Sequence, residues 1–254
     1  MEQKNYLTTI LAVGLIIVAL LLALNSKSNI VVSQNGLQKN TVSASGTSTL
    51  TVEPNKAEIY VKIDTVEKTA QDSKNKNSEI SSNVVKAFKR EGVEDKDIET
   101  AQFYIAPKYE YEEANDVNAR TSKQILIGYE VTNVLKVTTQ DLDKVGKLID
   151  VSVNNGANDI ERVSFGLSKE KEKDIKQQAM ILASSDAKDK AIALVTNLEV
   201  GLGKPISISE SNFYYQPYNL YSGAAQLEKS SAETTINPQK LDVSATVALV
   251  YEIR

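Results

Sequence analysis

The stretch from Ile125 to Thr138 alternates apolar and polar residues over an unusual length. Its odd positions are apolar, apart from Asn133, and this period of two is typical of a β-strand with one face in a core. At roughly 3.3 Å per residue the stretch would run about 45 Å, which is longer than an ordinary strand. Such a strand must be paired along most of its length, so the chain is predicted to build a sheet around it.

The periodicity of the remaining chain predicts further strands and helices. Alternating apolar residues predict strands over 41–52, 57–66, 98–106, 160–167, 205–213 and 241–253. Apolar residues three and four positions apart predict helices over 70–91, 142–155 and 169–198. Gly46 predicts a bulge or kink in the first strand. The longest helix is expected to bury one seam, made of Met180, Ala183, Ala187, Ala191, Leu194 and Leu198.

The order of these elements repeats. Strand, helix, strand, long loop and strand occur once over 57–138 and again over 160–253, joined by the second helix. This order favours an α+β fold made of two related βαββ halves. We expect ferredoxin-like pairing, in which helices pack on a mostly antiparallel sheet.

An apolar segment precedes this domain. Residues 7–24 carry no charge and are flanked by Lys4 and Lys27, which predicts a transmembrane anchor. Residues 1–6 would then be a short cytoplasmic N-terminus, residues 25–40 a polar linker, and residues 41–254 a domain outside the cytoplasm. The alternative is a signal peptide that is cleaved to release a secreted protein.

Composition excludes several functions. A net charge of -4 and a pI near 5.2 argue against nucleic acid as a partner. The chain has no cysteine, histidine or tryptophan. Thiol nucleophiles, disulfides, imidazole bases and the commonest zinc ligands are therefore all missing.

The remaining polar residues indicate no reaction. The acidic loop from Glu94 to Glu99 lacks the calcium-binding pattern of an EF-hand. Asp186 and Lys190, one helical turn apart, are expected to form a surface ion pair. We therefore predict no catalytic, cofactor-binding or metal-binding residue, with an unrecognised hydrolase as a remote alternative.

Tyrosine is concentrated in two places. Eight of the eleven tyrosines lie in or beside two stretches that resemble equivalent hairpins, namely Tyr104, Tyr109, Tyr111, Tyr129, Tyr214, Tyr215, Tyr218 and Tyr221. Tyrosine offers contact area together with a polar tip, which suits recognition surfaces. These residues are predicted to form an interaction surface, although they could instead pack the two hairpins against each other within one subunit.

Several short motifs, in this order and spacing, resemble the SIMPL-domain family, also called DUF541. They are Val42-Ser-Ala-Ser-Gly46, Pro54-Asn-Lys-Ala57, Asp97-Ile-Glu-Thr100, Pro107-Lys-Tyr109, Gly128-Tyr129, Gly156-Ala-Asn158 with Phe165, and Ala183-x-x-Asp186-Ala187-x-x-Lys190-Ala191. Asn55 departs from the family's usual Asp, and Gln239 from its common Gly. The resemblance implies an extracytoplasmic α+β domain related to periplasmic oxidative-stress-defence proteins and outer-membrane immunogens, with no established catalytic residues.

These observations together predict a membrane-anchored extracytoplasmic protein without catalysis. It would be a binding or scaffolding module in oxidative or envelope stress defence, with an envelope protein of unknown identity as its partner. The alternative is a structural protein that self-assembles through the tyrosine hairpins into a ring or channel-like homo-oligomer.

Overall fold

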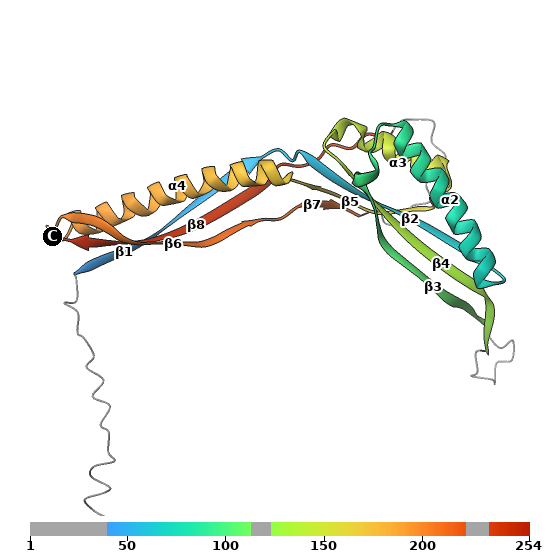
Figure 1. Cartoon of the computed structure of the whole chain (residues 1–254). Coiled ribbons are helices and arrows are strands. Elements are labelled where there is room, and N and C mark those ends of the chain that lie inside the picture. Colours follow the sequence, from blue (N-terminus) through green and yellow to red (C-terminus); the bar gives the residue numbers. More distant parts are fainter. Residues whose placement is uncertain (1–39, 113–122, 222–233) are drawn as a thin grey trace, which may run out of the picture. The chain divides into compact units, whose positions relative to one another are not determined.

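A computed structural model describes residues 40–112, 123–221 and 234–254 (Figure 1). Residues 41–254 form one compact unit, which is described here by itself, and residues 1–40 belong to a second unit. The anchor predicted at residues 7–24 lies outside the described residues. Within the described ranges, no helix has both the length and the apolar character needed to cross a membrane.

The described chain is a mixture of antiparallel strands and a few helices, as the alternation predicted. The strands are β1 (Thr41–Val52), β2 (Lys56–Glu67), β3 (Ile98–Glu112), β4 (Lys123–Thr139), β5 (Asp159–Gly166), β6 (Leu202–Tyr215), β7 (Tyr218–Leu220) and β8 (Leu241–Ile253). The helices are α2 (Ala70–Arg90), α3 (Val145–Asn154) and α4 (Lys169–Thr196), with short 3-10 turns at Asp95–Asp97 and Leu142–Lys144.

The strands form two separate sheets (Figure 1). The three-stranded sheet has the order β1-β8-β6, and α4 packs on its β1 and β8 strands. The five-stranded sheet has the order β3-β4-β2-β5-β7, and α2 packs on its β2 and β4 strands. The long strand predicted at residues 125–138 is β4, which is paired on both sides by β3 and β2. The prediction that it is paired along most of its length is confirmed.

The prediction of two related βαββ halves in one sheet is wrong. The strand that opens the second predicted half, β5, pairs with β2 in the five-stranded sheet. The other two strands of that half, β6 and β8, pair with each other in the three-stranded sheet, where β1 completes the set. Alternation along one strand identifies that strand but not its partner, because pairing joins residues far apart in the chain.

The longest helix buries part of the predicted seam: Ala183, Ala187 and Ala191 are buried as predicted. Its buried residues are spaced strictly by four, namely Ile175, Ala179, Ala183, Ala187, Ala191 and Val195. Each step of four advances about 40° around the helix, so the stripe winds slowly as the helix crosses the strands. Leu194 and Leu198, which were predicted to be buried, are 50% and 70% exposed.

Of the bulge or kink predicted at Gly46, the bulge is absent. The register of β1 against β8 is continuous from Thr41 to Val52. The glycine is needed instead because the backbone of α4 packs against the backbone of β1 here and leaves no room for a side chain. A Cβ atom at Gly46 would lie 2.0 Å from the Ala183 carbonyl oxygen and 2.3 Å from the Ala187 nitrogen.

The chain passes directly from one sheet to the other between β1 and β2. Asn55 holds this crossing: its backbone N–H donates to the Gly166 carbonyl at 3.0 Å. Its side chain accepts a hydrogen bond from the Ser168 N–H at 2.8 Å and lies 3.1 Å from the Ser168 hydroxyl. Ser168 is also the N-cap of α4, so one residue ties the crossing to the start of that helix.

Candidate interaction surface

The eight tyrosines that were predicted to form an interaction surface occupy two different places. One group, Tyr104, Tyr109, Tyr111 and Tyr129, lies on the paired strands β3 and β4. The other, Tyr214, Tyr215, Tyr218 and Tyr221, lies on β6, on β7 and just after β7.

The two groups lie on or beside antiparallel strand pairs that belong to different sheets. Strands β3 and β4 pair with each other in the five-stranded sheet, and β6 pairs with β8 in the three-stranded sheet. Both predicted strand pairs therefore form. The connection from β6 to β8 also contains β7, which carries Tyr218 and pairs with β5. Strands β3 and β7 form opposite edges of the five-stranded sheet, so the tyrosines of β3 and β7 do not lie side by side.

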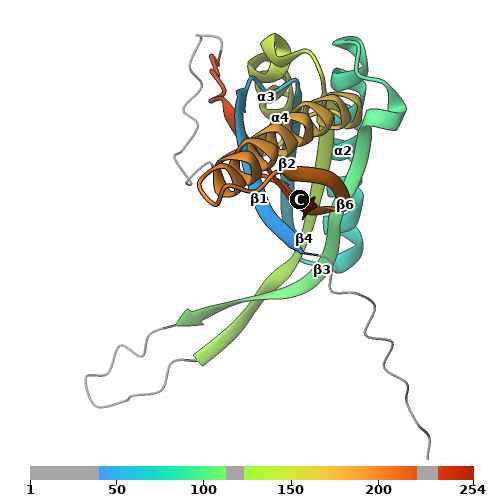
Figure 2. The same cartoon turned by 90° about the vertical axis from the view of Figure 1, so that its left-hand side faces the viewer.

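Two tyrosines of the first group, Tyr109 and Tyr111, lie where β3 and β4 continue beyond the rest of their sheet. Pairing of β2 with β4 ends at Glu67 opposite Tyr129, but pairing of β3 with β4 continues to Glu112 opposite Lys123. Figure 2 shows this two-stranded ribbon running out past the other strands. Tyr104 lies just before the ribbon begins. We call residues 103–112 and 123–129, which are the ribbon and the adjoining part of β3, the hairpin end.

The hairpin end has an unusually apolar exposed surface. Tyr111 is 69% exposed, and the other large apolar side chains here are between 38% and 49% exposed. They are Phe103, Tyr104, Ile105, Tyr109, Ile125, Leu126 and Ile127. Tyr129 is only half-buried. Exposed large apolar side chains gathered in this way are typical of an interaction site.

Local sequence determines how the ribbon leaves the sheet. The register of β3 against β4 shifts between Lys108 and Tyr109, next to Gly128. A Cβ atom at Gly128 would lie 2.5 Å from the carbonyl oxygen of Glu67, the last residue of β2. The glycine therefore allows the end of β2 to cross close to β4, just where the two-stranded part begins.

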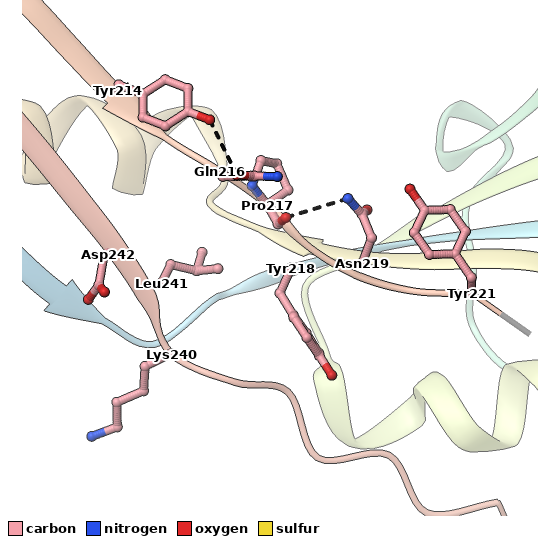
Figure 3. Close-up of a pocket in the computed structure, with 9 residues that line it drawn as sticks. All are labelled: Tyr214, Gln216, Pro217, Tyr218, Asn219, Tyr221, Lys240, Leu241 and Asp242. Atoms are coloured by element: carbon pink, nitrogen blue, oxygen red, sulfur yellow. Dashed lines mark hydrogen bonds between the residues drawn. The ribbon is translucent and has the colours of Figure 1, made fainter.

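Three tyrosines of the second group, Tyr214, Tyr218 and Tyr221, line a pocket of about 560 Å³. Figure 3 shows the residues that line it, which come from the end of β6, from β7 and from the start of β8. They are Tyr214, Gln216, Pro217, Tyr218, Asn219, Tyr221, Lys240, Leu241 and Asp242. Tyr214 and Tyr221 are 55% and 71% exposed.

Most polar groups of this pocket already have partners in the chain. The Tyr214 hydroxyl donates to Gln216 Oε1 at 3.4 Å, and Asp242 Oδ1 accepts from the Thr51 hydroxyl at 2.7 Å. The Tyr218 ring stacks on Phe165, with the centroids 6.3 Å apart. The pocket is thus lined mainly by aromatic and amide side chains, together with Lys240 and Asp242.

Tyr215 lies outside this pocket and is half-buried. Burial raises the pKa of its phenol, and the nearby Glu172 carboxylate raises the pKa further. A hydrogen bond with the Leu167 backbone opposes this shift without reversing it. The phenol therefore stays neutral at physiological pH, so Tyr215 is not an activated base or nucleophile.

The acidic loop that was considered for calcium is paired with lysines. Asp95 lies 2.5 Å from Lys89 and Glu94 lies 2.7 Å from Lys96. Glu99 pairs with Lys136, whose hydrogen bond lowers the pKa of the Glu99 carboxyl. Over residues 40–112, 123–221 and 234–254, no group of three or more acidic side chains is arranged to hold a metal ion.

The predicted ion pair on α4 is confirmed and has additional partners. Lys190 Nζ lies 2.6 Å from Asp186 Oδ2. The same carboxylate oxygen accepts a hydrogen bond from the Thr47 backbone N–H at 2.8 Å, and Lys190 donates to the Ser45 carbonyl at 3.3 Å. The pair therefore fastens α4 to the backbone of β1.

Sequence reasoning missed the aliphatic part of the hairpin end. A signal was present, because Ile125, Leu126 and Ile127 are consecutive and so place apolar side chains on both faces of a strand. A strand can bury only one face against a core on one side, so apolar residues on both faces leave one apolar face exposed. The pocket residues Gln216 and Asp242 gave no such signal, since the antiparallel pairing of β6 with β8, which places Tyr215 opposite Val243, brings them together.

Comparison with known proteins gives consistent matches over most of the chain. Residues 42–251 match the model of the SIMPL family, described as a protein of unknown function (DUF541). The uncharacterized protein YggE of Edwardsiella ictaluri is 28% identical over 218 residues, covering 84% of this chain and 86% of that protein. The 26 kDa periplasmic immunogenic protein of Brucella melitensis is 27% identical over 217 residues, covering 84% of each chain.

Proposed function

Because the chain belongs to the SIMPL family, we propose that it is a non-catalytic binding or scaffolding protein of the cell envelope. Residues 7–24 anchor it in the membrane, and residues 41–254 lie outside the cytoplasm. The uncharged apolar run over residues 7–24 supports the anchor. The periplasmic description of the Brucella melitensis relative supports the location.

The hairpin end is the observation that carries this proposal. It presents Tyr109, Tyr111 and Leu126 to solvent on a ribbon that no other described strand covers. Burying apolar side chains of this size contributes about 25 cal/mol per Å² of area removed from water. The hairpin end is therefore the contact surface for a protein partner in the envelope.

The partner surface is tested by crosslinking the full chain in its native membranes. We expect one specific crosslinked product, which is lost in the variant Tyr109→Ser/Tyr111→Ser/Leu126→Ser. The matched control Tyr214→Ser/Tyr221→Ser changes two equally exposed tyrosines beside the pocket and should keep the product. A product that survives the hairpin variant, or that disappears in the control alone, would reject the hairpin end as the contact surface.

A role in oxidative or envelope stress defence is the biological part of the proposal, and it rests on the family resemblance. A strain lacking the protein should be more sensitive to peroxide than its parent. Wild-type protein should restore growth, whereas the hairpin variant, expressed at an equal level, should not. Equal peroxide sensitivity of the deletion strain and its parent would reject the role.

The second candidate function is self-assembly into a ring or channel-like homo-oligomer. The two-sided apolar ribbon favours it, because the ribbon could insert between surfaces of a second copy. Light scattering over a range of concentrations separates the two functions. A monomer at every concentration would reject self-assembly, and an oligomer that the hairpin variant dissolves would support it.

The topology and the absence of catalysis each have a direct test. Protease added to intact cells should digest residues 41–254 and leave a membrane-bound fragment that contains residues 7–24. A mature protein without residues 7–24 in the medium would instead show cleavage and secretion. Turnover of a substrate that a single Ser or Lys substitution abolishes, without unfolding the protein, would show a hydrolase.

A further inference from the structure

In the described part of the chain, the two sheets have four edge strands, and three of these carry features that obstruct strand addition. An edge strand presents unpaired N–H and C=O groups that can pair with another chain. Strand β6 contains Pro205 and three register shifts, and β3 contains Pro107 and two register shifts. Strand β7 has only three residues. Proline, bulges and short length all hinder the pairing of an additional strand.

The fourth edge strand, β1, has none of these features. It is 12 residues long, with the sequence TVSASGTSTLTV, and contains neither proline nor charge. Its register against β8 is unbroken over its whole length. By the criteria that distinguish protected from open edges, β1 is the edge best suited to accept another strand.

Two backbone groups of this edge are bound by α4. The Thr47 N–H donates to Asp186 Oδ2 at 2.8 Å, and the Ser45 carbonyl accepts from Lys190 Nζ at 3.3 Å. In an antiparallel pair, alternate residues direct both backbone groups toward the same neighbour. Ser45 and Thr47 belong to one such set, and their bonds to α4 show that this set faces the open edge. The Asp186 carboxylate thus accepts from one backbone N–H of the edge, and the Lys190 ammonium donates to one backbone carbonyl. A neighbouring strand would satisfy the same two groups.

Space for an added strand lies beside this ion pair. A hollow of about 440 Å³ runs along β1 at Ser43 and Ser45, and the end of α4 lines its other side. Leu194, which lines the hollow, is 50% exposed. A strand placed against β1 would therefore cover an apolar side chain as well as form backbone hydrogen bonds.

We propose that the open edge of β1 is a strand-pairing surface for a second copy of this chain, and that the Asp186–Lys190 pair occupies its centre and keeps copies apart. A second copy fits because an antiparallel pair of β1 strands is two-fold symmetric. The strand is uncharged, so two copies meet without like-charge repulsion. This surface is separate from the hairpin end, and its function is independent of the partner proposed above.

The first test removes the ion pair from the full chain. We expect Asp186→Ala/Lys190→Ala to associate with increasing concentration, reaching twice the wild-type mass by light scattering. The matched control is Lys176→Ala/Glu210→Ala, which removes another 2.6 Å ion pair made by α4. In this control, Asp186 and Lys190 remain hydrogen-bonded to the β1 backbone. The control should keep the wild-type mass. A double variant at Asp186 and Lys190 that keeps the wild-type mass at every concentration would overturn the proposal.

The second test locates the contact by crosslinking. The chain has no cysteine, so Thr47→Cys places a single thiol on the β1 edge. A short bis-maleimide should crosslink Thr47→Cys in the Asp186→Ala/Lys190→Ala background and not in the wild-type background. Ser209→Cys, on the β6 edge, should not crosslink in either. Association without crosslinking at Thr47→Cys would place the contact elsewhere and overturn the proposal. If circular dichroism shows that the double variant is unfolded, Lys190→Ala alone is judged by the same two readouts.

Discussion

The two sheets are covered by helices in opposite ways. On the three-stranded sheet, α4 contacts β1 through alanines and Gly46, so that backbone nearly touches backbone. On the five-stranded sheet, α2 and α3 pack through large side chains such as Phe88 and Leu148, which separate the helix backbones from the strands. The first interface has no room for an added atom, and the second depends on every large side chain that fills it. The two regions should therefore respond oppositely to changes in side-chain size.

The largest effect is expected from adding one methyl group to the three-stranded sheet. Gly46→Ala would place a carbon 2.0 Å from a backbone oxygen of α4, and that backbone cannot move without displacing the helix. We expect a loss of more than about 4 kcal/mol in the free energy of unfolding, or no folded protein. Denaturant unfolding measures it. Gly166→Ala is the control, because its new carbon would have no atom closer than 3.7 Å and should change stability by less than about 1 kcal/mol.

A somewhat smaller loss is expected from removing a large side chain from the five-stranded sheet. Phe88 is fully buried, and Phe88→Ala should destabilise the protein by about 3–5 kcal/mol through the cavity left behind. The matched change in the other region, Ala187→Gly in α4, should lose about 1 kcal/mol because there is little side chain to remove. Equal losses of unfolding free energy in the two variants would contradict the claim that the two regions respond differently to side-chain removal.

The five-stranded sheet also contains buried polar groups under α2, which sharpen the comparison. The Asn77 side chain donates to the carbonyls of Ile63 at 2.8 Å and Val131 at 3.2 Å, so Asn77→Ala should lose about 1–3 kcal/mol. Asn133 has a buried side-chain oxygen without a protein partner and makes one 3.3 Å bond to Ser81. We expect Asn133→Val to leave stability unchanged or raise it by up to about 1 kcal/mol. A clear loss would show that the Asn133 oxygen is hydrogen-bonded in solution.

The smallest effect concerns the exposed ion pair on α4. Hydrogen bonds from Lys190 and from the Thr47 backbone lower the pKa of the Asp186 carboxyl. A lowered pKa in the folded state means that stability is present above the unfolded pKa and is lost as pH falls through the folded pKa. The stability contributed by the Asp186 carboxylate is therefore lost below about pH 4. Asp186→Asn should remove that contribution, and nuclear magnetic resonance titration should show a higher Asp186 pKa in Lys190→Ala. An unchanged pKa in Lys190→Ala would contradict the assigned cause.

The sequence predicted local structure well because each element has its own period. The helix predicted over 70–91 is α2, and the Thr69 hydroxyl just before it accepts from the Asp72 N–H at 3.1 Å. In α4 the three predicted alanines are buried, but Leu194 and Leu198 are exposed because the buried residues continue at intervals of four. The role of Gly46 could not be predicted, since it depends on a helix more than 130 residues later in the chain. For the same reason, the concentration of tyrosines could be read from the sequence, but their division between two sheets could not.

The pairing of β1 with β8 has a mechanical consequence. Thr41 lies opposite Glu252, so the start of β1 and the end of β8 emerge side by side (Figure 1). A pulling force applied between these two points would peel the strands apart one hydrogen bond at a time, as a zipper opens. It would not load the whole ladder in shear. A tether on one end and a load on the other would therefore open the three-stranded sheet first, and the five-stranded sheet would still be intact when β1 came free.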